Sequence, residues 1–580
     1  MDCRISKFLT SLGNLVVARY RIVVASLIIF NLGLAATSVK DKSLTYDETS
    51  YIAVGNYIVE TGDTEAIVPG SPPLPFFVVG IFWNLLDFNA SFWTEFRRAH
   101  ESGLRSLPLI FESGYDPDLL IFLARLPVIL TFPIMGLLIF NWSRQVFGLK
   151  AALLALTLAA FSPNLLAHSR LAATDFLAAV TFFGSAYSFR QYLKQPGWKN
   201  VLIAGCALGL ALMTKYTAAI LIPAYFVLLV VLPRADQTSR RTIANPAEYL
   251  RSAKFFEKTI GQPRMILSVA LMGITALLVI WAGHLFEFRS PYIPAFLESF
   301  DQGAYGGMLR YLQEHGIRIP AASYFVNLYH QSIHGRSGHP SFFMGEMSWQ
   351  GRWYYFPFAF LIKTPVPMLA LLLLVSLVSL KRSHREQGEE AFLLVPVALL
   401  LAGGIFSDIN IGLRHILPVY PFLFVWVSRA ANFRLSRCYP LVLSLFIAWY
   451  AGSNLHIYPH YLEYFNEFIG GPRNGHKYLV DSNLDWGQDL KLLLKYLKEN
   501  NIQPKKIVYF GPPWLLNYYG YQNGEADCNR VYGGFVTISV THLYSLYTYP
   551  HCHDWLRKYE PVDRIAYSIF IYKIPPVQNP

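Results

Sequence analysis

Long apolar runs constrain the fold of this sequence more than any other feature. A helix that crosses the roughly 30 Å hydrocarbon core of a bilayer needs about 20 mainly apolar residues. Eleven runs come close to this length, although several are shorter and their boundaries are approximate. We therefore predict a polytopic α-helical membrane protein with about 11 transmembrane helices. The runs lie near residues 22–38, 122–141, 151–167, 176–189, 200–213, 217–232, 266–283, 356–380, 391–406, 416–431 and 440–456.

The composition agrees with placement in a membrane. Hydrophobic residues make up 53% of the 580 residues and charged residues only 15%, whereas soluble domains carry about 25% charged residues. A soluble protein with so few charges would lack the polar surface needed to cover itself. The formal net charge of +12 does not indicate a nucleic-acid partner, because the basic residues lie in short segments between the apolar runs.

The alternation of these basic segments sets the predicted orientation, since loops rich in Lys and Arg stay in the cytoplasm. We expect a cytoplasmic N-terminus, and we place the acidic first loop, the 168–175 turn, the 284–355 loop and the C-terminal tail outside. The first apolar run has no convincing small-residue cleavage site, so we expect a retained span and not a removed signal peptide. The segments assigned to the cytoplasm carry Arg4, Lys7, Arg19 and Arg21; Arg144 and Lys150; Arg190, Lys194 and Lys199; the link 234–264; Lys381, Arg382 and Arg385; and Arg429, Arg434 and Arg437.

Two segments are compatible with more than one topology. A single long helix over residues 201–232, with Lys215 inside it, would place the basic 234–264 link outside. We therefore expect two short helices that meet at Thr214–Thr217. A further span over residues 72–88 would invert the orientation of everything downstream. We expect a membrane-surface or re-entrant helix in that segment instead.

A change of composition after His456 divides the chain into two predicted domains. Residues 1–456 form a transmembrane domain with a first outer loop at about 39–121 and a large outer loop at about 284–355. Residues 457–580 alternate strand and helix patterns, which predicts a small extracytoplasmic α/β domain. The strand-like runs are Lys506–Phe510, Phe535–Val540 and Ile565–Ile574, and the helical run is Trp486–Glu499, with Asp485 expected to cap its start.

The five cysteines do not form the framework of a metal site. Cys206 lies in an apolar run, and Cys3 and Cys438 lie near predicted cytoplasmic segments. Cys528 and Cys552 are the only pair assigned to the outside, where oxidising conditions allow disulfides. We predict that these two residues form a disulfide.

Acidic residues gather in the predicted outer loops. Asp47 and Glu48 follow the first span, and Asp175 ends the next outer turn. The Asp47–Glu48 pair could simply begin a helix, since acids favour helix N-termini, and Asp175 could pair with Arg170 in its own turn. Alternatively, a carboxylate just above the bilayer could act as the base for an acceptor hydroxyl that attacks a lipid-linked sugar.

Three cations lie at or near the outer ends of apolar runs, against the positive-inside trend. They are Lys215, Lys363 and Arg414. Each one alone is explained by a long side chain that extends to the interface, because a cation at the centre of a spanning helix costs roughly 2.5–3.5 kcal/mol. The three together favour a phosphate-binding role.

The 284–355 loop contains His330, His334, His339 and Glu346 among many aromatic residues. A metal site is one interpretation, although no pair has a tight ligand spacing on a clear helix. An aromatic belt at the membrane interface explains the tryptophans and tyrosines that follow, without any functional role.

Motifs over nearly the whole chain resemble the bacterial phospholipid-carrier-dependent glycosyltransferases. These are relatives of the protein O-mannosyltransferases and the aminoarabinose transferases, in the C-type membrane glycosyltransferase superfamily. The order of the motifs is more specific than the Asp-Glu pair alone. The matching segments are Asp47-Glu48, Arg125-Leu126-Pro127, Phe147-Gly148, Ser162-Pro163 through Asp175, Leu212-Met213-Thr214-Lys215, Gly338-His339-Pro340, Gly345-Glu346, Trp353 to Pro357, Lys363-Thr364-Pro365, Asn410 to His415, Tyr464 to Glu467 and Asp481 to Asp489.

The resemblance implies inverting transfer of one sugar from a polyprenyl-phosphate carrier to a protein, lipid or glycan acceptor on the non-cytoplasmic face. By that analogy Asp47 is the base, and Asp175, Lys215 and Arg414 assist the acceptor or the carrier phosphate. The implied catalytic set also includes Glu48, and the implied substrate-binding set also includes Lys363, His339, Glu346, Arg170 and His415. Relatives often carry a basic residue where this chain has Ser71. If that basic side chain helps to hold phosphate, another residue must replace it here. No cofactor is certain, and a divalent metal stays open.

Two other functions compete with glycosyl transfer. A transporter or flippase of lipid-linked sugars would place ionisable residues near the bilayer midplane, often within paired repeats. This sequence has no internal repeat, and its acids lie in outer loops. A non-catalytic scaffold would bind a partner through its outer tail and would not need Asp47. We therefore expect a multi-pass cell-membrane enzyme whose partners are the lipid carrier, its acceptor and membrane lipids, with no nucleic acid.

Overall fold

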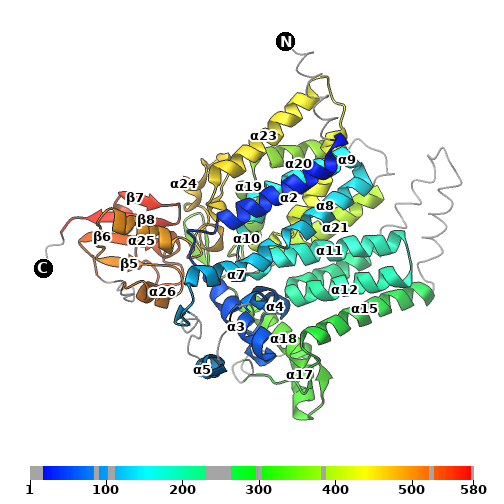
Figure 1. The fold of residues 1–580 in the computed structure, drawn as a ribbon, viewed down its shortest axis with the longest axis horizontal. Coiled ribbons are helices and arrows are strands. Elements are labelled where there is room, and N and C mark those ends of the chain that lie inside the picture. The colour runs from blue at the N-terminus through cyan, green and yellow to red at the C-terminus, as the bar shows by residue number, and fades with distance from the viewer. Residues whose placement is uncertain are drawn as a thin grey trace.

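The computed structural model consists of a bundle of long helices with a small sheet-containing unit at one end (Figure 1). It describes residues 17–83, 86, 90–101, 111–229, 263–294, 297, 303–379, 387–521, 528 and 530–576. Cys3, the basic residues Arg4 and Lys7, nearly all of the 234–264 link and the Lys381–Arg385 segment lie outside the described residues.

Each of the eleven predicted runs coincides with a helix or a pair of helices. By length and composition, five helical segments among the described residues are able to cross a membrane, or up to seven if two bent pairs each count as one span. The bends are 57° between α9 and α10 and 113° between α19 and α20. A polytopic membrane protein is therefore supported, whereas the number of crossings stays a prediction. The helices are α2 (Tyr20–Thr37), α7 (Pro117–Ile129), α8 (Phe132–Phe147), α9 (Leu149–Ala160), α10 (Pro163–Ser169), α11 (Thr174–Lys194), α12 (Trp198–Thr214), η3 (Tyr216–Ile220), α15 (Pro263–Gly283), α19 (Tyr355–Lys363), α20 (Val366–Ser379), α21 (Gln387–Ile405), α22 (Val419–Val427), η6 (Ser428–Asn432) and α23 (Tyr439–Ile457).

Small residues allow α12 and α15 to pack closely. Gly205 and Gly209 form a G-x-x-x-G pattern on α12. A Cβ atom at Gly205 would lie 2.7 Å from the carbonyl oxygen of Met272, and one at Gly209 would lie 2.7 Å from the Cβ atom of Val279. This is the close backbone approach that such patterns permit between membrane helices.

The helix break at Lys215 agrees with the prediction. Helix α12 ends at Thr214, and Lys215 has extended backbone angles, with φ −156° and ψ 134°. The hydroxyl of Thr174 donates to the carbonyl oxygen of Thr214 at 2.9 Å. A side chain from α11 thus satisfies a carbonyl that lacks its partner at the end of the helix.

The first outer loop folds against the bundle as short helices. Helix α4 spans seven residues, which gives a length of about 10 Å at 1.5 Å per residue, too short to cross a bilayer. This length supports the surface interpretation of residues 72–88. The elements of this loop are α3 (Glu48–Thr61), η1 (Thr64–Ala66), α4 (Leu74–Gly80) and α5 (Ala90–Glu101).

Among its described residues, the predicted large outer loop contains two small hairpin-like sheets and the helices α17 and α18. Strand β1 pairs with β2, and β3 pairs with β4, both in antiparallel fashion. The elements are β1 (Phe288–Arg289), α17 (Gly303–Glu314), β2 (Ile319–Pro320), α18 (Ala322–Ser337), β3 (Ser341–Phe343) and β4 (Glu346–Ser348). After α21, the later outer turn forms η5 (Leu413–Ile416).

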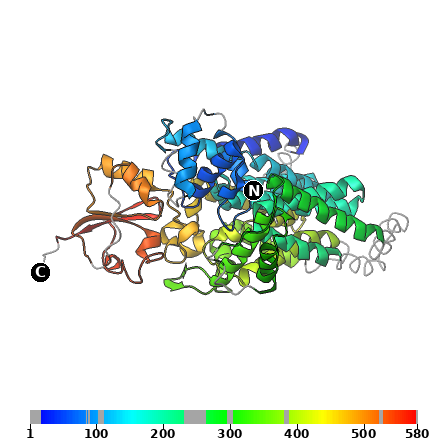
Figure 2. The same cartoon turned by 90° about the horizontal axis from the view of Figure 1, so that it is seen from below.

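The C-terminal part forms a four-stranded sheet in the order β5-β6-β8-β7, which projects from one end of the bundle (Figure 2). Strands β5 and β6 are parallel, and the other neighbouring pairs are antiparallel. All three predicted strand-like runs contain strands. The elements are η7 (Tyr461–Glu463), η8 (Glu467–Ile469), α24 (Pro472–Gly475), η9 (Asp481–Asn483), α25 (Leu490–Glu499), β5 (Lys506–Val508), α26 (Pro513–Tyr518), β6 (Gly534–Ser539), α27 (Val540–Leu543), η10 (Leu556–Lys558), β7 (Asp563–Ile565) and β8 (Ile569–Ile574).

The predicted cap at Asp485 is wrong. Helix α25 begins only at Leu490 and follows Asp489. The Asp485 carboxylate instead accepts hydrogen bonds from the backbone N–H of Thr541 at 3.1 Å and of Gly487 at 3.4 Å. These contacts hold Asp485 against another part of the C-terminal unit, and the helix begins later in the chain than predicted.

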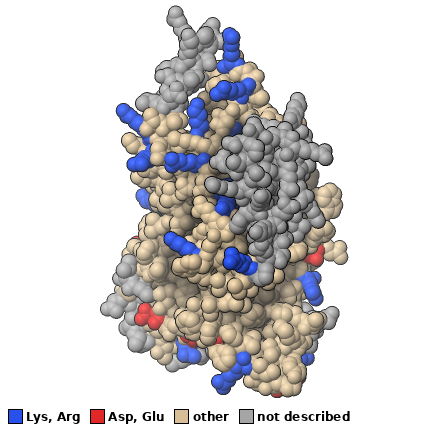
Figure 3. Space-filling model, turned by 90° about the vertical axis from the view of Figure 1, so that its right-hand side faces the viewer, with Lys and Arg blue, Asp and Glu red and all other residues tan. Residues whose placement is uncertain are grey.

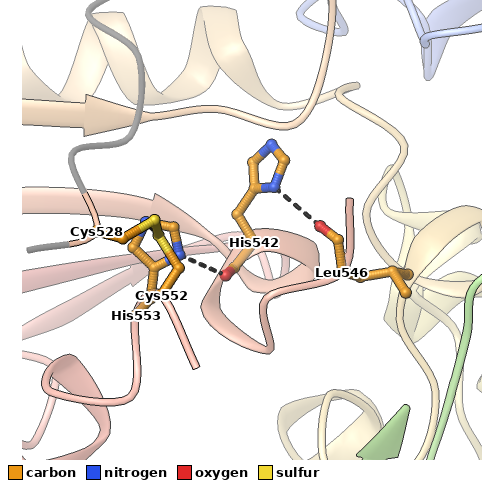
Figure 4. Close-up of a disulfide and its surroundings, with 5 residues drawn as sticks. All are labelled: Cys528, His542, Leu546, Cys552 and His553. Carbon is orange, nitrogen blue, oxygen red and sulfur yellow. Dashed lines mark hydrogen bonds between the residues drawn. A yellow bond between two sulfur atoms is a disulfide. The ribbon is translucent and has the colours of Figure 1, made fainter. Parts of the chain in front are cut away.

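The predicted disulfide between Cys528 and Cys552 is present (Figure 4). Cys552 precedes His553, whose Nδ1 donates to the carbonyl oxygen of His542 at 2.9 Å. The ring of His542 in turn donates to the carbonyl oxygen of Leu546 at 3.2 Å. Burial lowers the pKa of His542 to about 4, so this ring is neutral at physiological pH. These contacts support the turn that follows α27.

The end of the bundle opposite the sheet is strongly basic. Figure 3 views this end, and on the part of its surface that is described, Lys and Arg side chains clearly outnumber Asp and Glu. Two described segments lie near this end, the C-terminal end of α11 and the N-terminal end of α12 (Figure 1).

Candidate active site

Four of the charged residues singled out in the sequence meet in one cluster, which we call the charge cluster: Asp47, Asp175, Lys215 and Arg414. Arg414 Nη1 lies 2.7 Å from Asp47 Oδ2 and 3.6 Å from Asp175 Oδ2. Lys215 Nζ lies 2.6 Å from Asp175 Oδ1. Four separate segments supply these side chains: the residue before α3, the first turn of α11, the break after α12, and η5.

The charge cluster is open to solvent mainly at Asp47. The side chain of Asp47 is 34% exposed, whereas that of Asp175 is 1% exposed and that of Arg414 is 9% exposed. Two carboxylates and two cations make its formal charges cancel. A buried charge is costly without a partner, so Asp175 is held as an anion by Lys215 and Arg414. The carboxylate of Asp47 is the group that an incoming molecule can reach.

Three residues near Arg414 were not identified as site residues from the sequence. The guanidinium of Arg414 lies over the ring of Trp486, with its carbon 4.1 Å from the ring centroid. Burial raises the pKa of Asp481, which accepts a hydrogen bond from the hydroxyl of Tyr547. Burial and the neighbouring Asp481 carboxylate raise the pKa of Tyr547. In the sequence, Asp481 to Asp489 supplies a motif of the resemblance and the predicted start of a helical run, and its density of polar residues beside a tryptophan is the signal that could have indicated a site.

Glu48 lies next to Asp47 but faces away from solvent. It is fully buried, and its two carboxylate oxygens each accept a 2.7 Å hydrogen bond from the guanidinium of Arg125. The backbone N–H groups of Thr45 and Ala172 also donate to it. Burial alone would raise the pKa of Glu48, but the charge and hydrogen bonds of Arg125 outweigh it and lower the pKa. Glu48 therefore ties together the first loop, α7 and the turn before α11.

Two cations of the predicted substrate-binding set are bound to backbone carbonyls instead of facing the cluster. Lys363 Nζ donates to the carbonyl oxygen of Leu462 at 2.9 Å and also to that of Asn483. Arg170 Nη1 donates to the carbonyl oxygens of Ser38 at 2.9 Å and Pro459 at 2.6 Å. Both cations connect the transmembrane helices to the segment that follows α23.

The remaining predicted residues lie at different distances from the cluster. His415 follows Arg414 directly, and its Nε2 is buried without a hydrogen-bond partner. His339 Nδ1 donates to the carbonyl oxygen of Pro340 at 3.0 Å, and its ring lies 5.6 Å from the ring of Tyr547. The side chain of Glu346 is 79% exposed and pairs with Arg352. His339 thus borders the site through Tyr547, whereas Glu346 lies on an exposed hairpin.

Within the described part of the chain, one triad has the geometry to hold a metal ion: His460, Glu463 and Asp489. The ammonium group of Lys42 already lies within this triad. Lys42 Nζ is 2.9 Å from His460 Nδ1, 3.0 Å from Glu463 Oε1 and 2.5 Å from Asp489 Oδ1. The predicted candidates His330, His334, His339 and Glu346 do not form such a group among the described residues.

Comparison with known proteins identifies the fold. A family model described as dolichyl-phosphate-mannose-protein mannosyltransferase matches residues 120–256, which include Asp175 and Lys215. The structure is similar to the Saccharomyces cerevisiae protein O-mannosyltransferase Pmt1-Pmt2 complex bound to its sugar donor, with a TM-score of 0.51 and 11% identity over 78% of this chain and 91% of that chain. The chain therefore shares the fold of this protein O-mannosyltransferase.

Two further structures are similar to this chain at lower TM-scores. ArnT from Cupriavidus metallidurans, bound to undecaprenyl phosphate, has a TM-score of 0.45 and 13% identity over 94% of this chain and 97% of that chain. The oligosaccharyltransferase AglB from Archaeoglobus fulgidus, in complex with an inhibitory peptide and a dolichol-phosphate, has a TM-score of 0.41 and 11% identity over 93% of this chain and 72% of that chain. A comparison with curated protein sequences gives no match.

Proposed function

We propose that this chain transfers one sugar, with inversion, from a polyprenyl-phosphate carrier to a hydroxyl group of a protein, lipid or glycan acceptor on the non-cytoplasmic face. Asp47 acts as the base. One observation carries the proposal: a solvent-accessible carboxylate lies 2.7 Å from a cation that also borders a buried Asp–Lys pair. A carrier phosphate needs the cations, and an acceptor hydroxyl needs the carboxylate.

The proposed step is an in-line displacement at the anomeric carbon of the donor sugar. The acceptor oxygen forms a bond to this carbon while the bond from the carbon to the phosphate oxygen breaks. The acceptor proton passes to the carboxylate of Asp47, and the polyprenyl phosphate leaves with the electron pair. Lys215 and Arg414 stabilise the negative charge that the phosphate gains, because preorganised cations act most strongly in a site from which water is largely excluded.

Arg414 has to divide its contacts between Asp47 and the phosphate. Without a ligand, Arg414 donates to Asp47 at 2.7 Å. A bound phosphate competes for the same guanidinium. When Arg414 turns to the phosphate, the carboxylate of Asp47 becomes available for the acceptor hydroxyl.

The other residues implied by the resemblance receive different parts in this proposal. Glu48 positions Asp47 through Arg125, in place of the catalytic part implied from the sequence. Lys363 and Arg170 hold the backbone that carries the site. His415 and His339 stay proposed as substrate contacts, because they border Arg414 and Tyr547.

The charge distribution supports the proposed orientation. The basic end of the bundle in Figure 3 suits the cytoplasmic face, since Lys and Arg are retained there. The C-terminal sheet lies at the opposite end of the molecule (Figure 1). Its disulfide suits an oxidising compartment. Together these features favour a cytoplasmic N-terminus and an extracytoplasmic site.

Mass spectrometry of glycans and lipids tests the function in cells. We would compare cells that lack the gene with cells that express the wild type, Asp47→Asn or Asp41→Asn. Asp41 is an exposed acid in the same loop, so its variant matches the charge loss without touching the charge cluster. We expect one glycosylated product to be present with the wild type and Asp41→Asn and absent with Asp47→Asn. Product formation by Asp47→Asn would contradict the assignment of the base.

A further inference from the structure

The segment from Asp481 to Asp489 is buried over all nine residues, although six of them are polar. Burying polar groups costs free energy unless each finds a partner. The partners therefore indicate what the segment does. They come mainly from the two loops that carry Asp47 and Arg414, together with residues of the C-terminal unit.

One end of the segment holds the loop that leads to Asp47. The backbone N–H of Ser43 donates to the carbonyl oxygen of Gln488 at 2.8 Å, and the N–H of Tyr46 donates to that of Trp486 at 2.9 Å. Lys42 Nζ lies 2.5 Å from Asp489 Oδ1. Two backbone hydrogen bonds and a buried ion pair thus bind the residues directly before the proposed base.

The other end holds the turn that carries Arg414. The side-chain oxygen of Asn483 accepts a 2.9 Å hydrogen bond from the N–H of Leu413, and the hydroxyl of Ser482 donates to the carbonyl oxygen of Ile411 at 2.9 Å. A Cβ atom at Gly412 would lie 2.3 Å from Ser482 Oγ. A side chain at position 412 would therefore force the Ser482 hydroxyl to move.

Trp486 connects the two ends. Its carbonyl oxygen accepts a hydrogen bond from the backbone N–H of Tyr46, which directly precedes the proposed base. The centroid of its ring lies 4.1 Å from the guanidinium carbon of Arg414. An aromatic face attracts a guanidinium without using its N–H groups, which point outward in the guanidinium plane. Arg414 is therefore supported from one side and keeps its donors for Asp47, Asp175 or a phosphate.

We infer that the segment 481–489 is a positioning element of the active site, which sets the separation of Asp47 and Arg414 and supports Arg414 on the ring of Trp486. Trp486 is a positioning residue, since it acts through Arg414. The inference rests on the proposed function in one respect, namely that Arg414 binds the carrier phosphate. The contacts that hold the Asp47 loop can be tested without any ligand.

The first test measures binding of sugar-free undecaprenyl phosphate to the purified full chain in detergent. Trp486→Leu should weaken binding about three- to tenfold, and Trp486→Phe, which keeps an aromatic face, should weaken it less. In an Arg414→Met background, Trp486→Leu should not weaken binding further. Trp486 acts through the guanidinium of Arg414, so the effects of the two substitutions are not additive. Trp142→Leu is the matched control, since Trp142 is buried and has Arg190 over its ring at 5.7 Å, remote from the charge cluster.

The second test measures backbone hydrogen exchange without ligand. Lys42→Met removes the ammonium from Asp489 and should speed exchange in residues 43–46 by about tenfold or more, because a buried charge-assisted contact is lost. Strand β5 should not change. Lys194→Met, which removes an ion pair with Glu389 at the other end of the bundle, is the control.

The two tests separate this inference from the proposed function. Failure of the wild type to bind undecaprenyl phosphate would contradict the proposed function, and the exchange measurement would then decide the inference alone. If the wild type binds, equal losses from Trp486→Leu in the wild-type and Arg414→Met backgrounds would overturn the role of Trp486. Unchanged exchange in residues 43–46 of Lys42→Met would overturn the positioning of the Asp47 loop.

Discussion

Replacing Asp47 by asparagine is expected to tighten the binding of sugar-free undecaprenyl phosphate. In the unliganded protein, Arg414 donates a hydrogen bond to Asp47 at 2.7 Å. An incoming phosphate would have to compete with Asp47 for this guanidinium. The formal charges of Asp47, Asp175, Lys215 and Arg414 cancel in the wild type. The Asp47→Asn substitution would leave the charge cluster with one net positive charge and would keep the shape of the side chain. A simple loss of a binding residue would have the opposite effect.

The burial of the Asp47–Arg414 pair limits the size of this effect. Two unit charges about 4 Å apart interact by about 4 kcal/mol at an effective dielectric constant of 20, and by about 1 kcal/mol in water. Arg414 is nearly buried, but the side chain of Asp47 is 34% exposed, so solvent screens much of the interaction. A net effect of about 1 kcal/mol corresponds to roughly fivefold tighter binding. The gain should shrink as salt concentration rises.

Isothermal titration or microscale thermophoresis of the purified protein in detergent would measure this affinity. Asp41→Asn controls for the removal of a nearby negative charge, since its side chain is exposed and outside the charge cluster. Arg414→Met should weaken binding, because a charge-assisted hydrogen bond is lost. Unchanged or weaker binding by Asp47→Asn, relative to both the wild type and Asp41→Asn, would refute the competition for Arg414.

Three further predictions concern stability and orientation. Glu48→Gln should lower the unfolding temperature, because it leaves the buried guanidinium of Arg125 without its carboxylate at a cost of about 3–5 kcal/mol; an unchanged temperature would show that the pair is not a structural tie. Burial raises the pKa of Asp485 to about 8, against about 3.9 in an unfolded chain, so the folded state binds more protons and stability should fall as pH rises between these values. Asp485→Asn should remove this part of the pH dependence, which unfolding temperatures at pH 6 and pH 8 would check. Reporter fusions after Gln195 and at the C-terminal end should report cytoplasmic and extracytoplasmic positions respectively, and a cytoplasmic C-terminal signal would contradict the orientation.

The sequence predicted the helical elements well, because lipid requires long apolar runs and these are visible without partners. The break at Lys215 was predicted from the placement of basic loops alone, and the structure places it after Thr214. The pairing of Cys528 with Cys552 followed from the same topology. In each case one local or compartmental constraint decided the outcome.

Contacts between distant segments could not be predicted in the same way. Lys363 and Arg170 were both predicted to bind substrate, but backbone carbonyls from Pro459, Leu462 and Asn483 bind them instead. Side-chain periodicity contains no information about such partners. Asp485 looked like a helix cap for a similar reason, since the sequence does not show that Thr541 lies beside it.

The charge cluster itself was partly foreseen. Asp47, Asp175, Lys215 and Arg414 were each noted as charges on the outer side of apolar runs, and the structure brings them together. Trp486 was missed because a buried tryptophan ordinarily indicates only a hydrophobic core. Its role becomes visible only when the guanidinium above its ring is seen.

The most direct test of the central claim is sugar transfer by purified Asp47→Asn protein, measured beside carrier binding in the same preparation. The donor would be the polyprenyl-phosphate sugar identified by the cellular mass spectrometry. We predict that transfer falls by about 100-fold or more, because the proton acceptor is lost, while undecaprenyl phosphate still binds. Near-normal transfer by Asp47→Asn would contradict the assignment of Asp47 as the base.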